Sequence, residues 1–146
     1  MTGKLVQLSI SNGGMPKLPV AGARVTREGV SGDCHKNRKY HGGEDRAICI
    51  FSIELYDRLR THKIDLTPGA VGENFTTAGI DLDAIKPGDR FRVGEAEIEI
   101  MKVRVPCKSL TQWHPKLHKI INGHSGWMAR VTQEGEVKAG DPIEIL

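Results

Sequence analysis

The sequence is poor in aromatic residues and has no long apolar run. Only 5% of its 146 residues are aromatic, and neither Trp113 nor Trp127 lies in a basic-aromatic repeat, so a base-stacking platform for nucleic acid has little support. No run of about 18 apolar residues is present, and residues 1–10 lack the apolar block and cleavage site of a signal peptide. These absences predict a cytoplasmic protein without a nucleic-acid or membrane partner.

Cysteine is also scarce. Three cysteines are odd in number and too few for a disulfide framework, so we expect free thiols in a reducing compartment. Cys34 stands close to His35 and His41 in the sequence, but neither a CxxC pair nor the usual histidine spacing of a zinc site is present. Cys49 lies in an apolar run and is expected in the core, and any further function of Cys34 and Cys49 stays open.

Positive charge is in slight excess, without a basic block. The formal net charge is +3 and the pI is about 8.8, and the Lys and Arg residues are spread along the chain. This distribution suits a small anionic ligand at least as well as nucleic acid. A serine nucleophile elbow, a P-loop and a dinucleotide fingerprint are all absent, so those enzyme classes lose support.

Short strands separated by turns dominate what is present. The chain length fits a single domain over residues 1–146. The alternation of apolar and polar residues predicts a strand over residues 4–10 with Val6, Leu8 and Ile10 on one face. Further strands are predicted in residues 20–30, 47–51, 74–77, 126–131 and 143–146, with loops over 32–43 and most of 66–79 and a turn at 134–135.

Two helices complete the predicted fold. One runs over residues 53–62 after the capping residue Ser52, and the other over 114–122 between Pro115 and Gly123. Many short strands with about two short helices predict a mainly β (α+β) domain, barrel-like or a sandwich.

A hairpin of residues 90–93 and 96–105, turning at Gly94 and Glu95, leads into the segment of greatest interest. Its second strand changes parity, because the apolar residues at 96, 98 and 100 share one face and those at 103 and 105 share the other. A regular strand cannot bury both sets against one core. We therefore predict a bulge near Met101 and Lys102 that re-aims the residues after it.

The residue that follows this strand and Pro106, Cys107, is the candidate reactive group. Pro106 cannot donate to a strand ladder and places Cys107 at a sheet margin or pocket mouth. Arg104 and Lys108 bring positive charge close in sequence, which favours the reactive thiolate. The alternative is that Cys107 is a small buried hydrophobe.

Two loops offer groups that bind anions. In YHGGEDRA, residues 40–47, successive glycine amides and the fork of Arg46 suit phosphate; the alternative is a Gly-Gly turn with an Asp45–Arg46 ion pair. In VGENF, residues 71–75, Gly72 allows close approach, Glu73 is an acid or acceptor, and Asn74 both donates and accepts. The alternative here is a turn stabilised by Asn74.

Taken in order, the segments GDCHKNRKYHGGEDRA, PGAVGENFTTAG, GDRFRVGEAEIEI, VRVPCKSL, GHSGWMARV and AGDPIEIL resemble the MOSC domain, the molybdenum-cofactor sulfurase C-terminal domain family. The resemblance runs from about residue 5 to residue 146 and is nearest to the small stand-alone bacterial members. It implies a β-barrel fold. It also implies that Cys107 is the residue that bears sulfur or ligates molybdenum.

The resemblance further implies a set of pocket and cofactor-phosphate contacts: His41, Asp45, Arg46, Asn74 and Arg104. In members studied as enzymes, the cysteine ligates the molybdenum of molybdopterin and N-hydroxylated compounds are reduced; other members are thought to carry or transfer sulfur. We therefore expect a molybdenum-cofactor protein, with a sulfur donor or redox partner, that acts through Cys107. The alternatives are a metal-free persulfide carrier and a non-catalytic barrel that binds RNA or protein. Substrate, electron donor and oligomeric state are left open.

Overall fold

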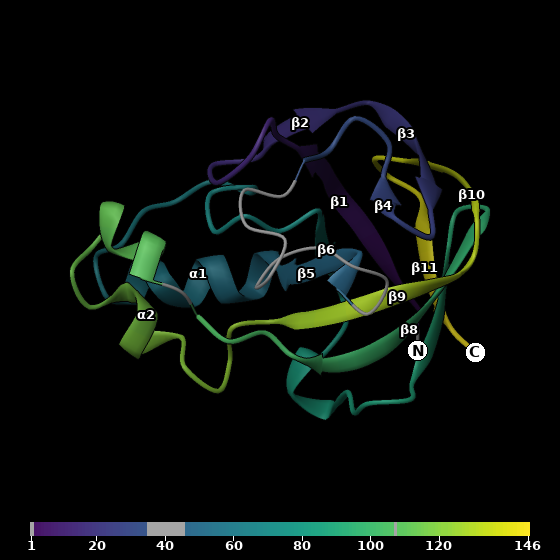
Figure 1. Ribbon diagram of the computed structural model, residues 1–146. Helices are drawn as coiled ribbons and strands as arrows, with labels where there is room; N and C mark the ends of the chain where they lie inside the picture. Colours follow the sequence, from purple (N-terminus) through teal and green to yellow (C-terminus); the bar gives the residue numbers. More distant parts are fainter. Residues whose placement is uncertain (1, 35–45, 107) are drawn as a thin grey trace.

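Short strands form most of the fold, as the sequence predicted. The computed structural model describes residues 2–34, 46–106 and 108–146. Its main sheet contains β1 (Thr2–Ile10), β2 (Leu18–Val20), β5 (Ile48–Ser52), β6 (Phe75–Ala78), β7 (Arg90–Val93), β8 (Ala96–Val103), β9 (Trp127–Gln133) and β11 (Pro142–Ile145). The order is β11-β7-β8-β9-β5-β6-β1-β2, and β1 also pairs with β11. Seven strands thus close a barrel, with β2 added to β1 (Figure 1).

A smaller sheet and two helices surround the barrel. The sheet has the order β10-β3-β4, from β3 (Gly22–Thr26), β4 (Gly29–Val30) and β10 (Gly135–Lys138). The helices are α1 (Ile53–Thr61) and α2 (Leu117–Ile120), and in Figure 1 they lie toward the opposite side of the molecule from the small sheet. The predicted barrel-like fold with two short helices is therefore confirmed. The turn predicted at residues 134–135 leads directly into β10, a strand that the sequence analysis missed.

The predicted bulge lies in β8. Ile100 pairs with Ala129 and Lys102 pairs with Met128, so Met101 is the extra residue between two consecutive partners on β9. Between these two pairs β8 advances by two residues and β9 by one, which reverses the face to which later residues of β8 point. The strand itself ends at Val103 and not at residue 105 as predicted.

The predicted apolar face of β1 is partly wrong. Leu5 and Leu8 are fully buried, whereas Val6 is 38% exposed. The pairing of β1 with β6 shifts register between Leu5 and Gln7. This irregularity interrupts the strict alternation on which the prediction rested, because one shifted residue reverses the faces.

The helix starts differ in how well they were predicted. Ser52 caps α1 as expected, since its Oγ accepts a hydrogen bond from the Leu55 N–H at 3.1 Å.

The second helix is much shorter than the predicted range of residues 114–122. The Lys116 N–H donates to Nδ1 of His114 at 3.1 Å, so the residues before Leu117 form a turn. Two 3₁₀ helices, η2 (Leu82–Ala84) and η3 (Lys108–Gln112), complete the described elements.

No helix in the described ranges combines the length and the apolar character needed to cross a membrane.

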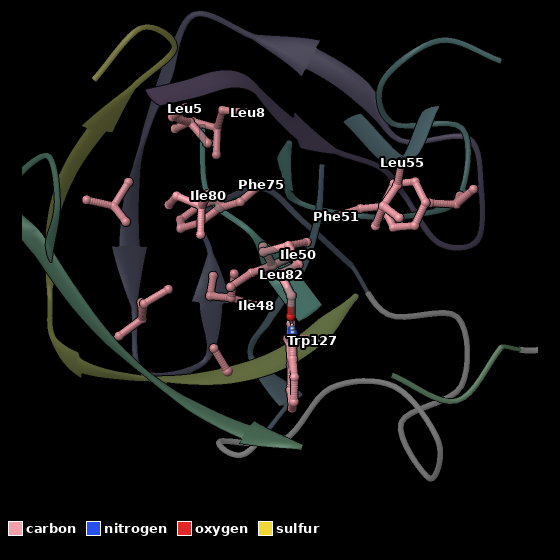
Figure 2. Packing of buried hydrophobic residues seen from close by; sticks show 14 of the residues in the cluster. Leu5, Leu8, Ile48, Ile50, Phe51, Leu55, Phe75, Ile80, Leu82 and Trp127 are labelled. Atoms are coloured by element: carbon pink, nitrogen blue, oxygen red, sulfur yellow. Dashed lines mark hydrogen bonds between the residues drawn. The ribbon is translucent and has the colours of Figure 1, made fainter. Parts of the chain in front are cut away.

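Strand β5 separates two apolar regions. Figure 2 shows Ile48 and Ile50 among the side chains inside the barrel, whereas Phe51 lies apart from them, beside Leu55. The Phe51 and Tyr56 rings pack edge to face with centroids 4.9 Å apart. Since successive strand residues alternate, Cys49 shares the outer face of β5 with Phe51. The candidate site lies on this outer face.

Candidate functional site

The structure describes three of the predicted site residues. Arg46 is half-buried two residues before β5, Asn74 is buried immediately before β6, and Arg104 is buried immediately after β8. Cys107, His41 and Asp45 lie outside the described residues, so the assignments made for them stay predictions. The shared pocket predicted for Cys107, Arg46 and Asn74 also stays a prediction.

Arg104 is held in the interior by its backbone and by one side of its guanidinium group. It is only 6% exposed, and Nη2 donates to the carbonyl oxygen of Val71. The backbone N–H of Arg104 donates to the Gly126 carbonyl at 3.0 Å, and the backbone carbonyl of Arg104 accepts from Oγ of Ser125. Nη1 is buried and has no hydrogen-bond partner in the structure as described. A buried cationic N–H group without an acceptor is unfavourable, so Nη1 marks a position where an anionic group would be stabilised.

The side chain of Asn74 links strands β1 and β5 and the turn that contains Asp33. Nδ2 donates to the Ser9 carbonyl at 3.1 Å and to Oδ2 of Asp33 at 2.9 Å. Oδ1 accepts from the Cys49 N–H at 3.1 Å. Both N–H donors of the amide are therefore used. The side chain shapes the loop of residues 71–74, which also touches Arg104 through Val71.

A buried ion pair, which the sequence analysis did not identify, lies next to Asn74. Nζ of Lys17 is 2.6 Å from Oδ2 of Asp33, and the two side chains are only 8% and 2% exposed. Oδ1 of Asp33 accepts from the Ser11 N–H at 2.9 Å. Asp33 falls in the stretch of residues 32–43 that the sequence predicted only as a loop, and nothing local in the sequence indicates its ion-pair partner.

Glu73 forms the other buried acidic centre. Oη of Tyr56 donates at 2.7 Å to the carboxylate, while Oγ1 of Thr76 and the Gly69 N–H donate to Oε2 at 2.8 and 3.1 Å. Burial raises the pKa of Glu73, and these hydrogen bonds act in the opposite direction. Burial and the adjacent Glu73 charge together raise the pKa of Tyr56. Glu73 is thus an acceptor that fixes the loop before β6, one of the two roles that the sequence indicated.

Cys49 lies among these charged groups. The side chain is 8% exposed, as expected for a residue in a buried strand. Burial raises the pKa of the thiol, which the charge of Arg104 partly offsets and that of Glu73 reinforces. Cys49 is therefore a protonated thiol in this environment and not an activated nucleophile.

The described residues suit an anionic group better than a metal ion. No three His, Cys, Asp or Glu side chains within the described ranges gather in a way that would hold a metal ion. Arg104 offers an unsatisfied cationic donor, while Asn74 and Glu73 fix the loop that carries its Val71 partner. This arrangement fits a phosphate-bearing ligand held by a guanidinium group.

Comparison with known proteins agrees with the fold. The family model of the MOSC domain matches residues 37–144. The chain is 32% identical over 139 residues to YflK of Bacillus subtilis (strain 168), covering 91% of this chain and 63% of YflK. It is 32% identical over 127 residues to a protein named Reductase from Gibberella moniliformis, covering 81% of this chain and 22% of that protein. The chain thus spans less than two thirds of the length of both curated relatives.

A solved structure extends the similarity over nearly the whole chain. The crystal structure of YiiM from Geobacillus stearothermophilus has a TM-score of 0.82 and 29% sequence identity, covering 99% of this chain and 75% of that chain. Since the family model alone covers more than half of the sequence, the chain belongs to the MOSC domain family.

Proposed function

We propose that this protein binds a molybdenum cofactor through Cys107 and uses it to reduce N-hydroxylated compounds. The observation that carries the proposal is the buried, unpartnered Nη1 of Arg104, three residues before Cys107 in the sequence. Membership in the MOSC family and a relative named Reductase support the same class of activity.

The chemistry of these groups fits the parts of the cofactor. The Arg104 guanidinium would hold its phosphate, because a planar fork of N–H donors matches phosphate oxygens. The thiolate of Cys107 is a soft ligand of the kind that suits a metal bound by sulfur. His41, Asp45 and Arg46 are proposed as further pocket contacts. Asn74 would act mainly by shaping the loop of residues 71–74, since both of its N–H donors are already used.

The protein's part in the reaction is to bind and orient. When bound, the cofactor supplies the redox chemistry. Arg104 lies three residues before Cys107 in the sequence, and its positive charge would stabilise the anionic form of a bound group. The hydrogen bonds of Ser125 and Gly126 to the Arg104 backbone fix where that segment leaves β8.

Metal, pterin and activity measurements on matched cysteine variants test the proposal. The wild type, Cys107→Ser and the exposed-cysteine control Cys34→Ser are made in a host that synthesises molybdenum cofactor. We expect molybdenum, pterin and reduction of an N-hydroxylated compound in the wild type and in Cys34→Ser, and loss of all three in Cys107→Ser. Full metal content and activity in Cys107→Ser would reject the mechanism.

The same preparations distinguish the alternatives. A metal-free sulfur carrier would show a mass increase of about 32 Da on Cys107 that is lost on reduction, as expected for a persulfide. Finding this adduct without molybdenum would favour sulfur transfer over reduction. Salt-sensitive RNA binding that Cys107→Ala leaves unchanged would instead support a non-catalytic barrel.

A further inference from the structure

We infer that a hollow on the outer face of β9 binds the phosphate group of a small molecule, independently of the proposed cofactor site. The hollow has a volume of about 250 Å³ and is lined by Arg27, Arg130, Val131 and Thr132. Two of these four residues are arginines from different elements, and a third bears a hydroxyl group. The proposed function does not use any of them.

The geometry of β9 and of the β3–β4 turn brings these groups together. Arg130, Val131 and Thr132 are consecutive on β9, and all three line the hollow. The pairing of β9 with β8 shifts register here, because Val131 pairs with Ile98 and Gln133 with Glu97, so Thr132 is an extra residue of β9. Arg27 follows β3 and reaches across to β9. Its Nη1 donates to the Val131 carbonyl at 3.2 Å and its Nη2 to the Thr132 carbonyl at 3.5 Å.

Both guanidinium groups are oriented by the protein before any ligand binds. Nε and Nη2 of Arg130 donate to Oε1 of Glu99 at 3.2 and 2.8 Å. A guanidinium group has five N–H donors, so the bonds from Arg27 to two carbonyls hold one part of the group and leave other N–H donors. Prior orientation of the donors lowers the entropy lost when a ligand binds.

An unsatisfied hydroxyl group adds a third donor. Oγ1 of Thr132 is buried and has no hydrogen-bond partner in the part of the chain that the structure describes. A phosphate oxygen accepts hydrogen bonds from both hydroxyl and guanidinium donors. Thr132, which carries this unsatisfied hydroxyl oxygen, lines the hollow together with Arg27 and Arg130.

Two carboxylates are close to the hollow and limit its net charge. Glu99 offsets Arg130, and Oε2 of Glu134 accepts from the backbone N–H of Arg27 at 2.9 Å. The guanidinium group of Arg27, in contrast, donates to backbone carbonyls, which are neutral. We therefore expect moderate affinity, with Arg27 as the dominant cation.

Position and size separate this hollow from the proposed cofactor site. Arg104 is bonded to the carbonyl of Gly126, and Val131 lies five residues further along, about 16 Å away at the usual rise of a strand. Ligand pockets for whole drug-sized molecules measure about 300–1,000 Å³, so the hollow suits a phosphate and a small attached group. A nucleic-acid strand would need a continuous basic groove with stacking aromatics.

An NMR titration of ¹⁵N-labelled protein tests the inference, with inorganic phosphate as the first probe and glycerol 3-phosphate as the second. We expect saturable shifts at Arg27, Arg130 and Thr132. Arg27→Gln should weaken binding at least about tenfold, and Thr132→Val by a smaller factor. Arg92→Gln, which removes an exposed and ion-paired arginine of β7, should leave binding unchanged.

The remaining outcomes are equally decisive. Tighter binding of glycerol 3-phosphate identifies a phosphorylated molecule as the ligand, and equal binding identifies free phosphate. Arg27→Lys keeps the positive charge but lacks the planar guanidinium group. It should bind phosphate more weakly than the wild type while unfolding at the same temperature. Equal binding by the wild type and Arg27→Gln, absence of binding with both probes, or preference for an oligonucleotide would overturn the inference.

Discussion

Buried charged side chains define the site at the scale of single residues. Asp33 accepts hydrogen bonds from Lys17, Asn74 and the Ser11 N–H, and Glu73 accepts from Tyr56, Thr76 and the Gly69 N–H. A buried carboxylate is stable only when such donors surround it. These two acids therefore fix the loops on which Arg104 and Asn74 depend.

Glu73 predicts a specific pH dependence of stability. Burial raises its pKa above the value of 4.5 in the unfolded chain, so the folded protein retains this proton to higher pH. The contribution of Glu73 to the free energy of unfolding is then greatest below pH 4.5 and is lost as the pH rises through the folded-state pKa. Glu73→Gln should remove this loss, so that its unfolding free energy falls less with pH than that of the wild type.

Urea denaturation between about pH 5 and about pH 8 measures this difference. Glu28→Gln, which alters an exposed carboxylate, is the control and should follow the wild-type profile. Parallel profiles for the wild type and Glu73→Gln would show that Glu73 does not titrate differently in the folded state.

Removing one partner of the Lys17–Asp33 pair should lower the free energy of unfolding more than replacing both partners. Lys17→Met leaves the carboxylate of Asp33 buried without its cation and should destabilise the protein by about 3–5 kcal/mol. Adding Asp33→Asn removes that charge, and its side-chain oxygen can still accept from the Ser11 N–H, but its amide group replaces the oxygen that accepts from Asn74. The double variant should therefore recover part of the loss in chemical denaturation. A single variant within about 1 kcal/mol of the wild type would contradict a buried, coupled pair.

At the scale of elements, the turn before β9 positions the Arg104 segment. Gly126 has φ +94° and a Cβ at this position would lie 2.0 Å from the Ile50 carbonyl oxygen. Its own carbonyl accepts the Arg104 N–H. The approach of Gly126 to β5 thus sets the distance between the barrel and the residues that lead to Cys107.

Two glycines of the same turn provide a matched test. Gly126→Ala must displace the backbone of β5 or β9, whereas a Cβ added at Gly123, which has φ +83°, would meet no atom within 4 Å. Gly123→Ala should cost about 1–2 kcal/mol through its left-handed backbone alone. Gly126→Ala should cost at least about 2 kcal/mol more. Similar costs in urea denaturation would mean that the turn can shift away from β5 freely.

The bulge in β8 shows what an element-level pattern can predict. The change of parity between Ile100 and Val103 predicted a bulge near Met101 and Lys102, because one strand cannot bury both faces against one core, and in the structure Met101 is the extra residue. In β1, the same alternation misassigned Val6. The register shift there arises where β1 pairs with β6, a partner far away in the sequence, so no local pattern indicates it.

For the whole molecule, turn signals and alternation were enough to predict a mainly β, barrel-like fold. They predicted the pairing of the β7–β8 hairpin but not that of the other strands, since the closure of β1 on β11, for example, joins the two ends of the chain. The site depends on the same long-range contacts. Asn74 and Arg104 were named from motifs, but Lys17 and Tyr56 acquire their partners only when the barrel brings Asp33 and Glu73 beside them.

The most direct test of the central claim is the molybdenum content per protein chain of the wild type and Arg104→Gln, made in a cofactor-competent host. Arg92→Gln removes an exposed arginine and is the control. We predict that the wild type and Arg92→Gln retain molybdenum through purification and that folded Arg104→Gln retains at most about one tenth as much, because it lacks the buried cationic donor. Equal molybdenum in all three proteins, or none in the wild type, would contradict the account.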